Sequence, residues 1–239
     1  MIELIDATKR FGGKTAVDKV SFALPPGRVT ALIGPNGAGK TTTLRLILGL
    51  DKPSGGRVLV DGRPYYRLRT PLTAVGALLD GSAAHPGRRA CDHLRWLAAG
   101  NGIPARRVDE VLEITGLSAV ARERVRGFSL GMKQRLGIAA ALLGDPPALL
   151  LDEPLNGLDP AGIRWARTLI RDRAAGGGTV LVSSHLMTEM SQIAEHGLVI
   201  ARGRILADAP LAELQSGHAS LEDAFFGLTE GHAEFQAGR

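Results

Sequence analysis

The segment GPNGAGKT, residues 34–41, contains the residue types best suited to phosphate chemistry, because it matches the pattern G-x-x-x-x-G-K-[ST]. It follows an apolar segment (28–33) that predicts a buried strand, and it precedes apolar residues at helical spacing. Glycines let successive backbone N–H groups surround phosphate oxygens, and the following helix adds its positive N-terminal dipole. Lys40 would contact β- and γ-phosphates and the Thr41 hydroxyl would bind Mg²⁺. This strand–loop–helix context argues against a glycine-rich turn without function.

Two acidic residues, Asp152 and Glu153, end a second apolar segment, PALLLDEP. Ligands of open α/β sheets bind at the carboxyl ends of the strands. Asp152 would therefore hold Mg²⁺ directly or through water. Glu153 would orient or deprotonate the water that attacks a γ-phosphate, a role worth about 10²–10⁴ in rate. Ordinary surface acids at a strand end are the alternative, and the phosphate loop in the same chain disfavours it.

His185 ends a third apolar segment, GTVLVSSH, which also predicts a buried parallel strand. A single histidine is most often structural. At the same sheet edge as Asp152 and Glu153, however, a contact with the γ-phosphate is favoured. The sequence therefore predicts Glu153 and His185 as catalytic residues, with Thr41 and Asp152 as metal ligands.

The octet FSLGMKQR, residues 128–135, places a serine and a glycine just before a helical segment. No histidine or acid in the octet could make Ser129 a nucleophile. Ser129 can instead cap the helix. A helix N-terminus that carries a hydroxyl group and a small glycine is also a good donor surface for a phosphate.

The elements that must position these motifs alternate between short apolar runs and helical segments, which indicates an α/β fold with a mixed sheet. Residues 86–143 are mainly helical in pattern, and LVIARGRILAD predicts a hairpin that turns at Arg202 and Gly203. We expect one domain over 1–217 with a helical insertion at about 75–143, followed by a C-terminal helix and tail over 218–239.

Composition limits the function classes. The chain of 239 residues can bury a substantial core, and no apolar run approaches the ~20 residues of a membrane span. The first residues contain Glu3 and Asp6 and no apolar core, so no secretory signal is expected. The single cysteine, Cys91, predicts a core residue and excludes a disulfide framework. The net charge of +5 is dispersed, which disfavours a nucleic-acid track.

Taken in order, the motifs resemble the nucleotide-binding subunit of ABC transporters over nearly the whole chain. The matching features are an aromatic residue (Phe11), the phosphate loop (34–42), a loop near Asp80, the signature FSLGM (128–132), Asp152-Glu153, the NGLD segment (156–159) and His185. The resemblance implies a P-loop NTPase fold of the ABC type with an inserted helical subdomain, and ATP and Mg²⁺ as cofactors. It also implies that the ATP-binding residues are Phe11, Val17, Gly34, Pro35, Asn36, Gly37, Ala38, Gly39, Lys40, Thr41, Thr42, Ser129, Gly131, Met132 and Asp159.

In that family two subunits face head to tail, and the signature of one completes the ATP site of the other. Ser129 would then contact a γ-phosphate across the interface, and Asp159 would cross it to report the state of one site to the other. Phe11 would stack on adenine, although a phenylalanine at a strand end can also belong to the core.

The chain departs from the family pattern at two places. It has no glutamine before Gln134, so the glutamine loop lacks its glutamine and Asp80 is the equivalent residue. Asp80 is either a metal ligand or an ordinary loop acid. The signature, usually Leu-Ser-Gly-Gly-Gln, has Leu130 and Met132 at two positions. Both departures resemble the branch that exports bacitracin-like and lantibiotic peptides.

The resulting prediction is an ATP-hydrolysing subunit that powers export of an antibiotic, peptide or other drug-like compound through a separate membrane permease. We expect two copies to pair, and we expect the chain in the cytoplasm, peripheral on the inner face of the cell membrane. The alternative is an ABC ATPase that acts on nucleic acid or ribosomes. The absence of a coiled-coil heptad array and of a second ATPase unit disfavours that alternative, and no nucleic-acid partner is expected. A soluble nucleotide kinase would not need FSLGMKQR.

Overall fold

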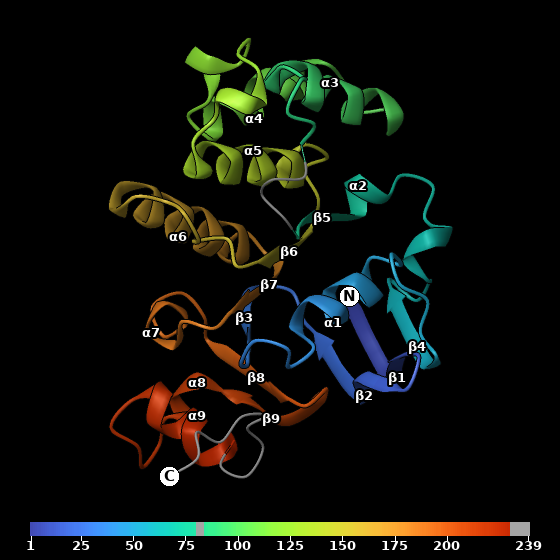
Figure 1. Ribbon diagram of the computed structural model, residues 1–239, viewed down its shortest axis with the longest axis vertical. Coiled ribbons are helices and arrows are strands. Elements are labelled where there is room, and N and C mark those ends of the chain that lie inside the picture. Colours follow the sequence, from blue (N-terminus) through green and yellow to red (C-terminus); the bar gives the residue numbers. More distant parts are fainter. Residues whose placement is uncertain (80–83, 230–239) are drawn as a thin grey trace.

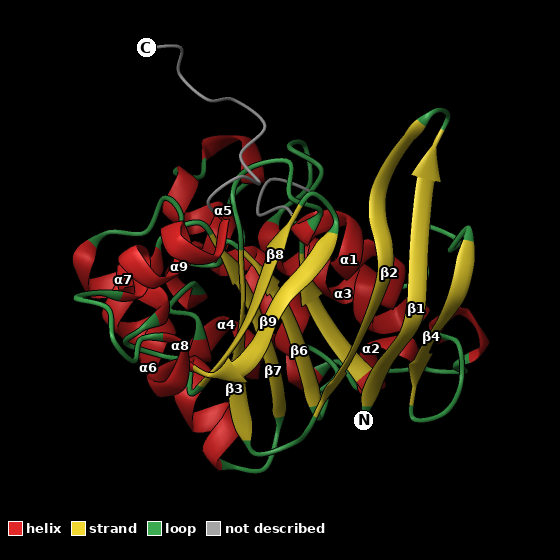
Figure 2. Cartoon of the chain, turned by 90° about the horizontal axis from the view of Figure 1, so that it is seen from below, coloured by secondary structure: helices red, strands yellow, loops and turns green. Residues whose placement is uncertain are grey.

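The computed structural model describes residues 1–79 and 84–229. It contains two sheets, and the smaller one lies along one side of the molecule (Figures 1 and 2). The smaller sheet is antiparallel, in the order β2 (Lys14–Leu24), β1 (Ile2–Phe11), β4 (Gly55–Val60). The larger sheet has the order β5 (Val75–Leu78), β6 (Ala148–Asp152), β7 (Thr179–Ser184), β3 (Arg28–Ile33), β8 (His196–Ala201), β9 (Arg204–Pro210). All its neighbours are parallel except β8 and β9, so the predicted mixed sheet is confirmed.

The helices belong to three groups. The helix α1 (Lys40–Ile47) follows β3, and α6 (Pro160–Ala175) follows β6. Three helices form one end of the molecule (Figure 1), and we call them the helical lobe: α3 (Ala90–Gly100), α4 (Arg106–Ile114) and α5 (Leu130–Leu142). Shorter helices are α2 (Pro71–Ala74), α7 (Met187–Met190), α8 (Leu211–Leu214) and α9 (Leu221–Thr229), with 3-10 turns at η1 (Tyr65–Arg67), η2 (Ser118–Val120) and η3 (Val125–Gly127).

The larger sheet separates two hydrophobic cores, because successive side chains of a strand point to opposite faces. In β6, Leu149 and Leu151 belong to the core shared with the helical lobe and α6, whereas Leu150 belongs to the core between the two sheets. The helix α1 fills that second core with Leu44 and Ile47, as their helical spacing predicted. Strands buried on both faces explain why their sequences are continuous apolar runs.

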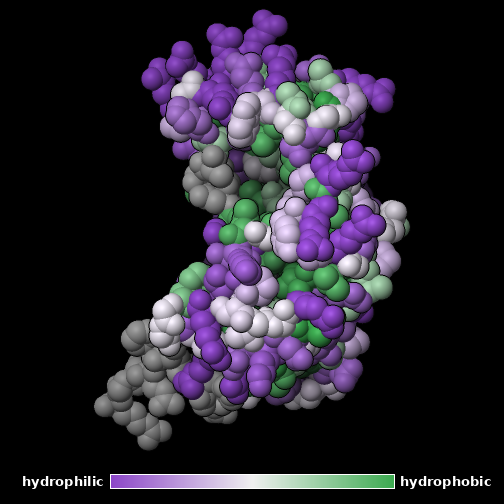
Figure 3. Space-filling view, turned by 90° about the vertical axis from the view of Figure 1, so that its right-hand side faces the viewer, coloured by the Kyte–Doolittle hydropathy of each residue, from purple (hydrophilic) through white to green (hydrophobic). Residues whose placement is uncertain are grey.

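The expected helical insertion begins later than the sequence pattern suggested. Residues Val75–Leu78 form β5 and pair in parallel with β6, so they belong to the central sheet. The last helix of the segment, α5, packs against β5 and thereby joins the helical lobe to the sheet. The outer surface of the helical lobe is mainly hydrophilic in the view of Figure 3. The limits of the domain (1–217) and of the C-terminal helix and tail (218–239) stay a prediction.

The predicted hairpin is present. β8 and β9 pair in antiparallel fashion, and Arg202 and Gly203 form the two-residue turn with φ angles of 48° and 76°. Positive φ at both positions is the geometry of a type I′ turn. The turn is also a support for the phosphate loop, because the Gly203 N–H donates to the carbonyl of Ala38 over 2.9 Å.

The C-terminal helix α9 docks on its own domain. It packs against α7, α8 and β9, and three of the four residues in its apolar stripe are buried: Leu221, Ala224 and Phe225. The fourth, Leu228, is 37% exposed. Cys91 is buried and unpaired, as predicted. Among the described residues, no helix has the length and apolar character needed to cross a membrane.

Candidate functional site

The phosphate loop connects β3 to α1 in the predicted strand–loop–helix arrangement. Two of its glycines have no room for a side chain. A Cβ on Gly34 would lie 2.3 Å from the Ile200 carbonyl oxygen, and one on Gly39 would lie 2.6 Å from the carbonyl oxygen of Ala16. Gly39 also has a φ of 108°, which favours glycine. The loop is therefore held closely between β2 and the β8–β9 hairpin.

Lys40 is the first residue of α1 and is only 7% exposed. Its ammonium donates hydrogen bonds to the carbonyl oxygens of Gly34 (2.7 Å) and Pro35 (3.2 Å). Burial lowers the pKa of Lys40 below its usual 10.5, and the nearby carboxylates of Glu153 and Asp152 oppose that shift. A buried cation that has only carbonyl partners and two neighbouring acids is well suited to receive phosphate charge.

Thr41 and Asp152 meet at the same edge of the sheet. The Thr41 hydroxyl donates to Asp152 Oδ2 over 2.6 Å, and the Ser183 hydroxyl donates to Asp152 Oδ1. Thr41 lies at the start of α1 and Asp152 at the end of β6, so the hydroxyl and the carboxylate come from segments that are far apart in the sequence. Oxygen donors of this kind suit Mg²⁺, which usually takes only one or two protein carboxylates together with waters and phosphate oxygens. The described residues contain no group of three or more His, Cys, Asp or Glu side chains arranged to hold a metal, which is compatible with such a sparse site.

Glu153 and His185 form a second pair at this edge. His185 Nδ1 lies 2.8 Å from Glu153 Oε1, and the Ser184 hydroxyl donates to Glu153 Oε2 over 3.4 Å. Glu153 has a φ of 48°, a left-handed conformation that is uncommon for a residue with a side chain. Its N–H donates to the Ser183 carbonyl oxygen over 3.1 Å, which helps to hold this conformation. The structure thus joins the two predicted catalytic residues.

One contact to Glu153 was not predicted. The Gln134 Nε2 donates to the main-chain carbonyl oxygen of Glu153 over 2.9 Å, and Gln134 is only 6% exposed. The sequence did contain a signal, because Gln134 is a polar residue in a helix that otherwise buries apolar side chains on several sides. A buried amide must find a partner.

A cavity of about 230 Å³ lies beside the phosphate loop. It is lined by Lys14, Ala16, Pro35, Asn36, Gly37, Gly39, Lys40, Thr41, Thr42, Asp152 and Glu153. Nine of these residues belong to the predicted loop and acid pair, and the structure brings them together. Lys14 and Ala16 were missed, since their place at the cavity follows from the course of β2 and not from any local motif.

The signature residues lie elsewhere on the same chain and do not line this cavity. Ser129 is exposed and caps α5, since its hydroxyl accepts from the Met132 N–H over 3.2 Å. Asp159 caps α6 by accepting from the Gly162 N–H over 2.7 Å. The Leu130 side chain is 62% exposed and covers Gly157, where an added Cβ would lie 2.4 Å from Leu130 Cγ. One chain therefore keeps its signature apart from its own phosphate loop.

The remaining predicted contacts have different outcomes. Phe11 is 49% exposed at the end of β1, with the Lys9 ammonium 4.7 Å from the ring centroid, so it is not a core residue. Val17 has no exposed surface and belongs to the core between the two sheets, because β2 turns that side chain inward. The expected contact of Val17 with ATP stays a prediction, and with this side chain buried it would have to be made by the main chain. Asp80 lies outside the described residues.

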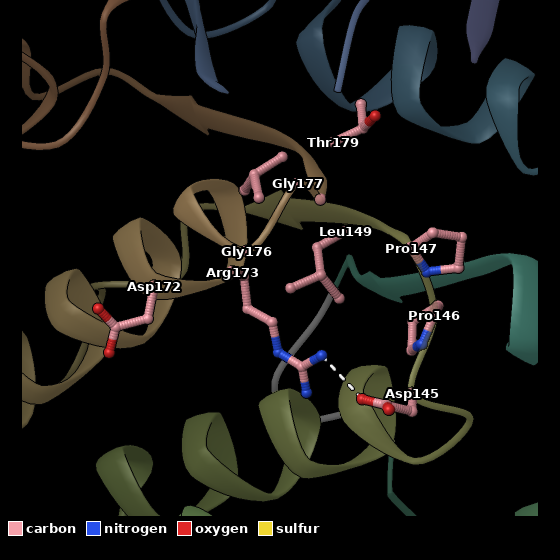
Figure 4. Close-up of a pocket in the computed structure, with 11 residues that line it drawn as sticks. Asp145, Pro146, Pro147, Leu149, Asp172, Arg173, Gly176, Gly177 and Thr179 are labelled. Atoms are coloured by element: carbon pink, nitrogen blue, oxygen red, sulfur yellow. Dashed lines mark hydrogen bonds and ion pairs between the residues drawn. The ribbon is translucent and has the colours of Figure 1, made fainter. Parts of the chain in front are cut away.

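A further hollow lies at the opposite edge of the larger sheet, where β6 and β7 begin (Figure 4). Its main polar contact joins Arg173 of α6 to Asp145 over 2.8 Å. This hydrogen bond lowers the pKa of Asp145, and the charges of Arg173 and Arg107 add to the effect. Arg107 of α4 also donates to the carbonyl oxygens of Leu142 (3.0 Å) and Leu143 (3.3 Å). The arrangement ties the helical lobe to α6.

The fold and this sheet edge define a P-loop ATPase of the ABC type. Residues 17–156 match the family model "ABC transporter", which covers more than half of the chain. The chain therefore belongs to the ABC transporter family, and it is an ATP-binding and ATP-hydrolysing subunit of such a transporter. The predicted fold class and family are confirmed.

Curated relatives are similar over most of the chain. The bacitracin transport ATP-binding protein BcrA of Bacillus licheniformis is 39% identical over 218 residues, which are 90% of this chain and 71% of that protein. The lantibiotic transport ATP-binding protein SrtF of Streptococcus pyogenes is 34% identical over 225 residues, which are 94% of this chain and 96% of that protein.

Solved structures agree with this assignment. The structure of an ATP-binding subunit of an ABC transporter has a TM-score of 0.87 at 28% identity, and the match covers 96% of this chain and 99% of that one. A dimeric bacterial ABC transporter cassette has a TM-score of 0.81 at 25% identity, covering 88% and 99%. The same cassette in a post-hydrolysis state, bound to ADP and Pi, has a TM-score of 0.80 at 25% identity over the same shares.

Proposed function

We propose that this chain hydrolyses ATP to drive the export of an antibiotic peptide or a similar compound through a separate membrane permease. The observation that carries the ATPase chemistry is the close pairing of Glu153 with His185 beside the phosphate loop. The export role is supported by the names of the two relatives, which transport bacitracin and a lantibiotic. As a permease-bound subunit, the chain would be cytoplasmic and peripheral on the inner face of the cell membrane.

The proposed binding step uses the loop and its lysine. Backbone N–H groups of 34–42 and the α1 N-terminus surround the phosphates, and the Lys40 ammonium exchanges its carbonyl partners for β- and γ-phosphate oxygens. Thr41 and Asp152 would hold Mg²⁺, which supplies charge neutralisation between the phosphates when bound. Phe11, with Lys9 beside its ring, offers a partly exposed aromatic surface for adenine.

The proposed chemical step is attack of water on the γ-phosphorus. Glu153 orients the water and accepts its proton, the bond from the γ-phosphorus to the β–γ bridging oxygen breaks, and ADP and phosphate leave. His185 orients the Glu153 carboxylate through the 2.8 Å contact and lies where it can also contact the γ-phosphate. This division of roles is supported by the placement of both residues at the ends of adjacent strands β6 and β7.

The proposed site is completed by a second copy of the chain. Ser129 is exposed at the N-terminus of α5, away from its own phosphate loop, and can donate to a γ-phosphate of a partner. Gly131, Met132 and Asp159 would lie at the same interface. A dimeric arrangement of a related cassette supports this proposal. ATP binding would then close the dimer and hydrolysis would release it, so that the permease receives the movement.

The function is tested by purifying the tagged chain with its bound partners from detergent-solubilised membranes. We expect an integral membrane protein to co-purify and the sample to hydrolyse ATP. The matched control is Glu153→Gln, which should recover the same membrane protein and bind ATP with little turnover. Recovery of ribosomes or nucleic acid in place of a membrane protein would contradict the proposal. Loss of Mg²⁺ to a chelator should stop turnover in the wild-type sample.

A further inference from the structure

The catalytic and signature motifs of one chain are physically joined. The carbonyl oxygen of Glu153 accepts two hydrogen bonds, one from Gln134 Nε2 (2.9 Å) and one from the N–H of Asn156 (3.2 Å). Gln134 belongs to α5, the helix that Ser129 caps. A helix moves largely as one body, so a displacement of Ser129 is also a displacement of Gln134.

A second contact joins the same two segments. Leu130 covers Gly157, and a Cβ added to Gly131 would lie 2.9 Å from the Gly157 carbonyl oxygen. The first turn of α5 therefore packs closely on the NGLD segment, which begins three residues after Glu153. Gln134 contacts Glu153, just before this segment, and Leu130 with Gly131 contacts Gly157 within it.

The backbone of Glu153 needs such support. Its φ of 48° is unfavourable for a residue with a side chain and persists only where surrounding contacts fix it. The direction of the Glu153 carboxylate depends on this backbone angle. In the observed conformation the carboxylate contacts His185 Nδ1. A misplacement of about 1 Å in a reacting group can cost about 10²-fold in rate.

We propose that Gln134 is a positioning residue that couples the two ATP sites of a dimer. This inference rests on the composite site proposed above. The nucleotide that Ser129 contacts belongs to the partner, whereas Glu153 serves the nucleotide on its own phosphate loop. When the partner's nucleotide contacts the N-terminus of α5, the position of Gln134 is fixed. Gln134 then fixes the backbone of Glu153. The Glu153 carboxylate is thereby aligned for hydrolysis of the nucleotide on its own phosphate loop.

The first test is Gln134→Met, which keeps the length of the side chain and removes its donor. We expect kcat to fall about 10- to 100-fold. KM for ATP should change less than about twofold, because Lys40 and the phosphate loop are untouched. Gln134→Leu, which also has no hydrogen-bond donor, should behave alike. An unchanged kcat in both variants would overturn the proposal.

A matched control separates positioning from general destabilisation. Asn101, which follows α3 and lies away from the site, also donates a side-chain amide hydrogen bond to a carbonyl oxygen, that of Leu97 over 3.0 Å. Asn101→Ala should lower the unfolding midpoint about as much as Gln134→Met does and leave kcat unchanged. If kcat follows the unfolding midpoint in both variants, Gln134 has only a structural role.

The coupling itself is tested by a double-mutant cycle with Ser129→Ala. If Gln134 carries the effect of Ser129 to Glu153, the double variant should be little slower than the slower single variant. Multiplicative losses in kcat would show independent roles and overturn the proposal. Wild-type protein that stays monomeric in the presence of ATP and still hydrolyses it at the full rate would contradict the composite site itself, which is a distinct result.

Discussion

His185 Nδ1 and Glu153 Oε1 lie 2.8 Å apart at the ends of neighbouring strands. Because the parallel register of β6 and β7 sets Asp152 opposite Ser183, the residues that follow each strand meet at one edge of the sheet. The contact between His185 and Glu153 is therefore a product of sheet register.

Removal of the carboxylate should abolish turnover without abolishing binding. In Glu153→Gln, we expect kcat to fall by about 10²–10⁴, because the amide cannot accept a proton from water. The Kd for ATP should stay close to that of the wild type, since the phosphate loop is unchanged. Steady-state phosphate release and equilibrium binding of a fluorescent ATP analogue measure the two quantities. Full turnover in the variant would remove Glu153 from the mechanism.

Loss of the Phe11 ring should weaken nucleotide binding. Aromatic stacking contributes about 0.5–1.5 kcal/mol, so Phe11→Ala should raise Kd for ATP roughly two- to tenfold with kcat little changed. Tyr66→Ala is the matched control, because Tyr66 is a 72% exposed aromatic residue that belongs to η1, between β4 and α2. Equal affinities for ATP in the Phe11 variant and the wild type would show that adenine binds elsewhere.

ATP affinity should depend on the protonation of Lys40. Burial lowers its pKa below 10.5 in the free protein, and bound phosphates favour the charged form. ATP binding should therefore be accompanied by proton uptake at pH values above this lowered pKa. In that pH range the affinity for ATP should fall by up to about tenfold per pH unit. Calorimetry in two buffers of different ionisation enthalpy measures the uptake.

Lys40→Arg provides the control for that measurement, because the guanidinium stays charged throughout the range. The measurement needs only ATP binding and no turnover. The proton uptake of the arginine variant at high pH should be smaller than that of the wild type. The same uptake in both proteins would assign the proton to another group.

The contact between Asp145 and Arg173 should add a small, pH-dependent stability. The pKa of Asp145 is lowered from 3.8 in the folded protein. The contact therefore contributes fully to the free energy of unfolding above about pH 3.8, and this contribution is lost as the pH falls through the lower pKa of the folded state. The side chain is 61% exposed, and solvent screening limits the contribution to less than about 1 kcal/mol. Denaturant unfolding of Asp145→Asn and the wild type should differ at pH 7 and converge in acid. A difference that persists in acid would contradict this assignment.

Local motifs allowed much of the site to be predicted. The phosphate loop, the acid pair and the histidine were identified because each follows an apolar strand, and parallel strands bring their carboxyl ends to one edge. The β8–β9 hairpin was predicted from Arg202 and Gly203 because a two-residue turn is a short-range feature. The limits of the helical insertion were less accurate, since a four-residue strand such as β5 resembles a short buried helical segment in its pattern.

The sequence by itself determined which chemistry this protein can perform, because the residues that bind phosphate and activate water stand in short motifs with fixed spacing. Only the tertiary structure decided which segments touch. It buried Val17, brought Lys14 to the cavity and placed Gln134 against the carbonyl oxygen of Glu153. These contacts join residues distant in sequence, and their partners are selected by sheet register and helix packing, which no local pattern records.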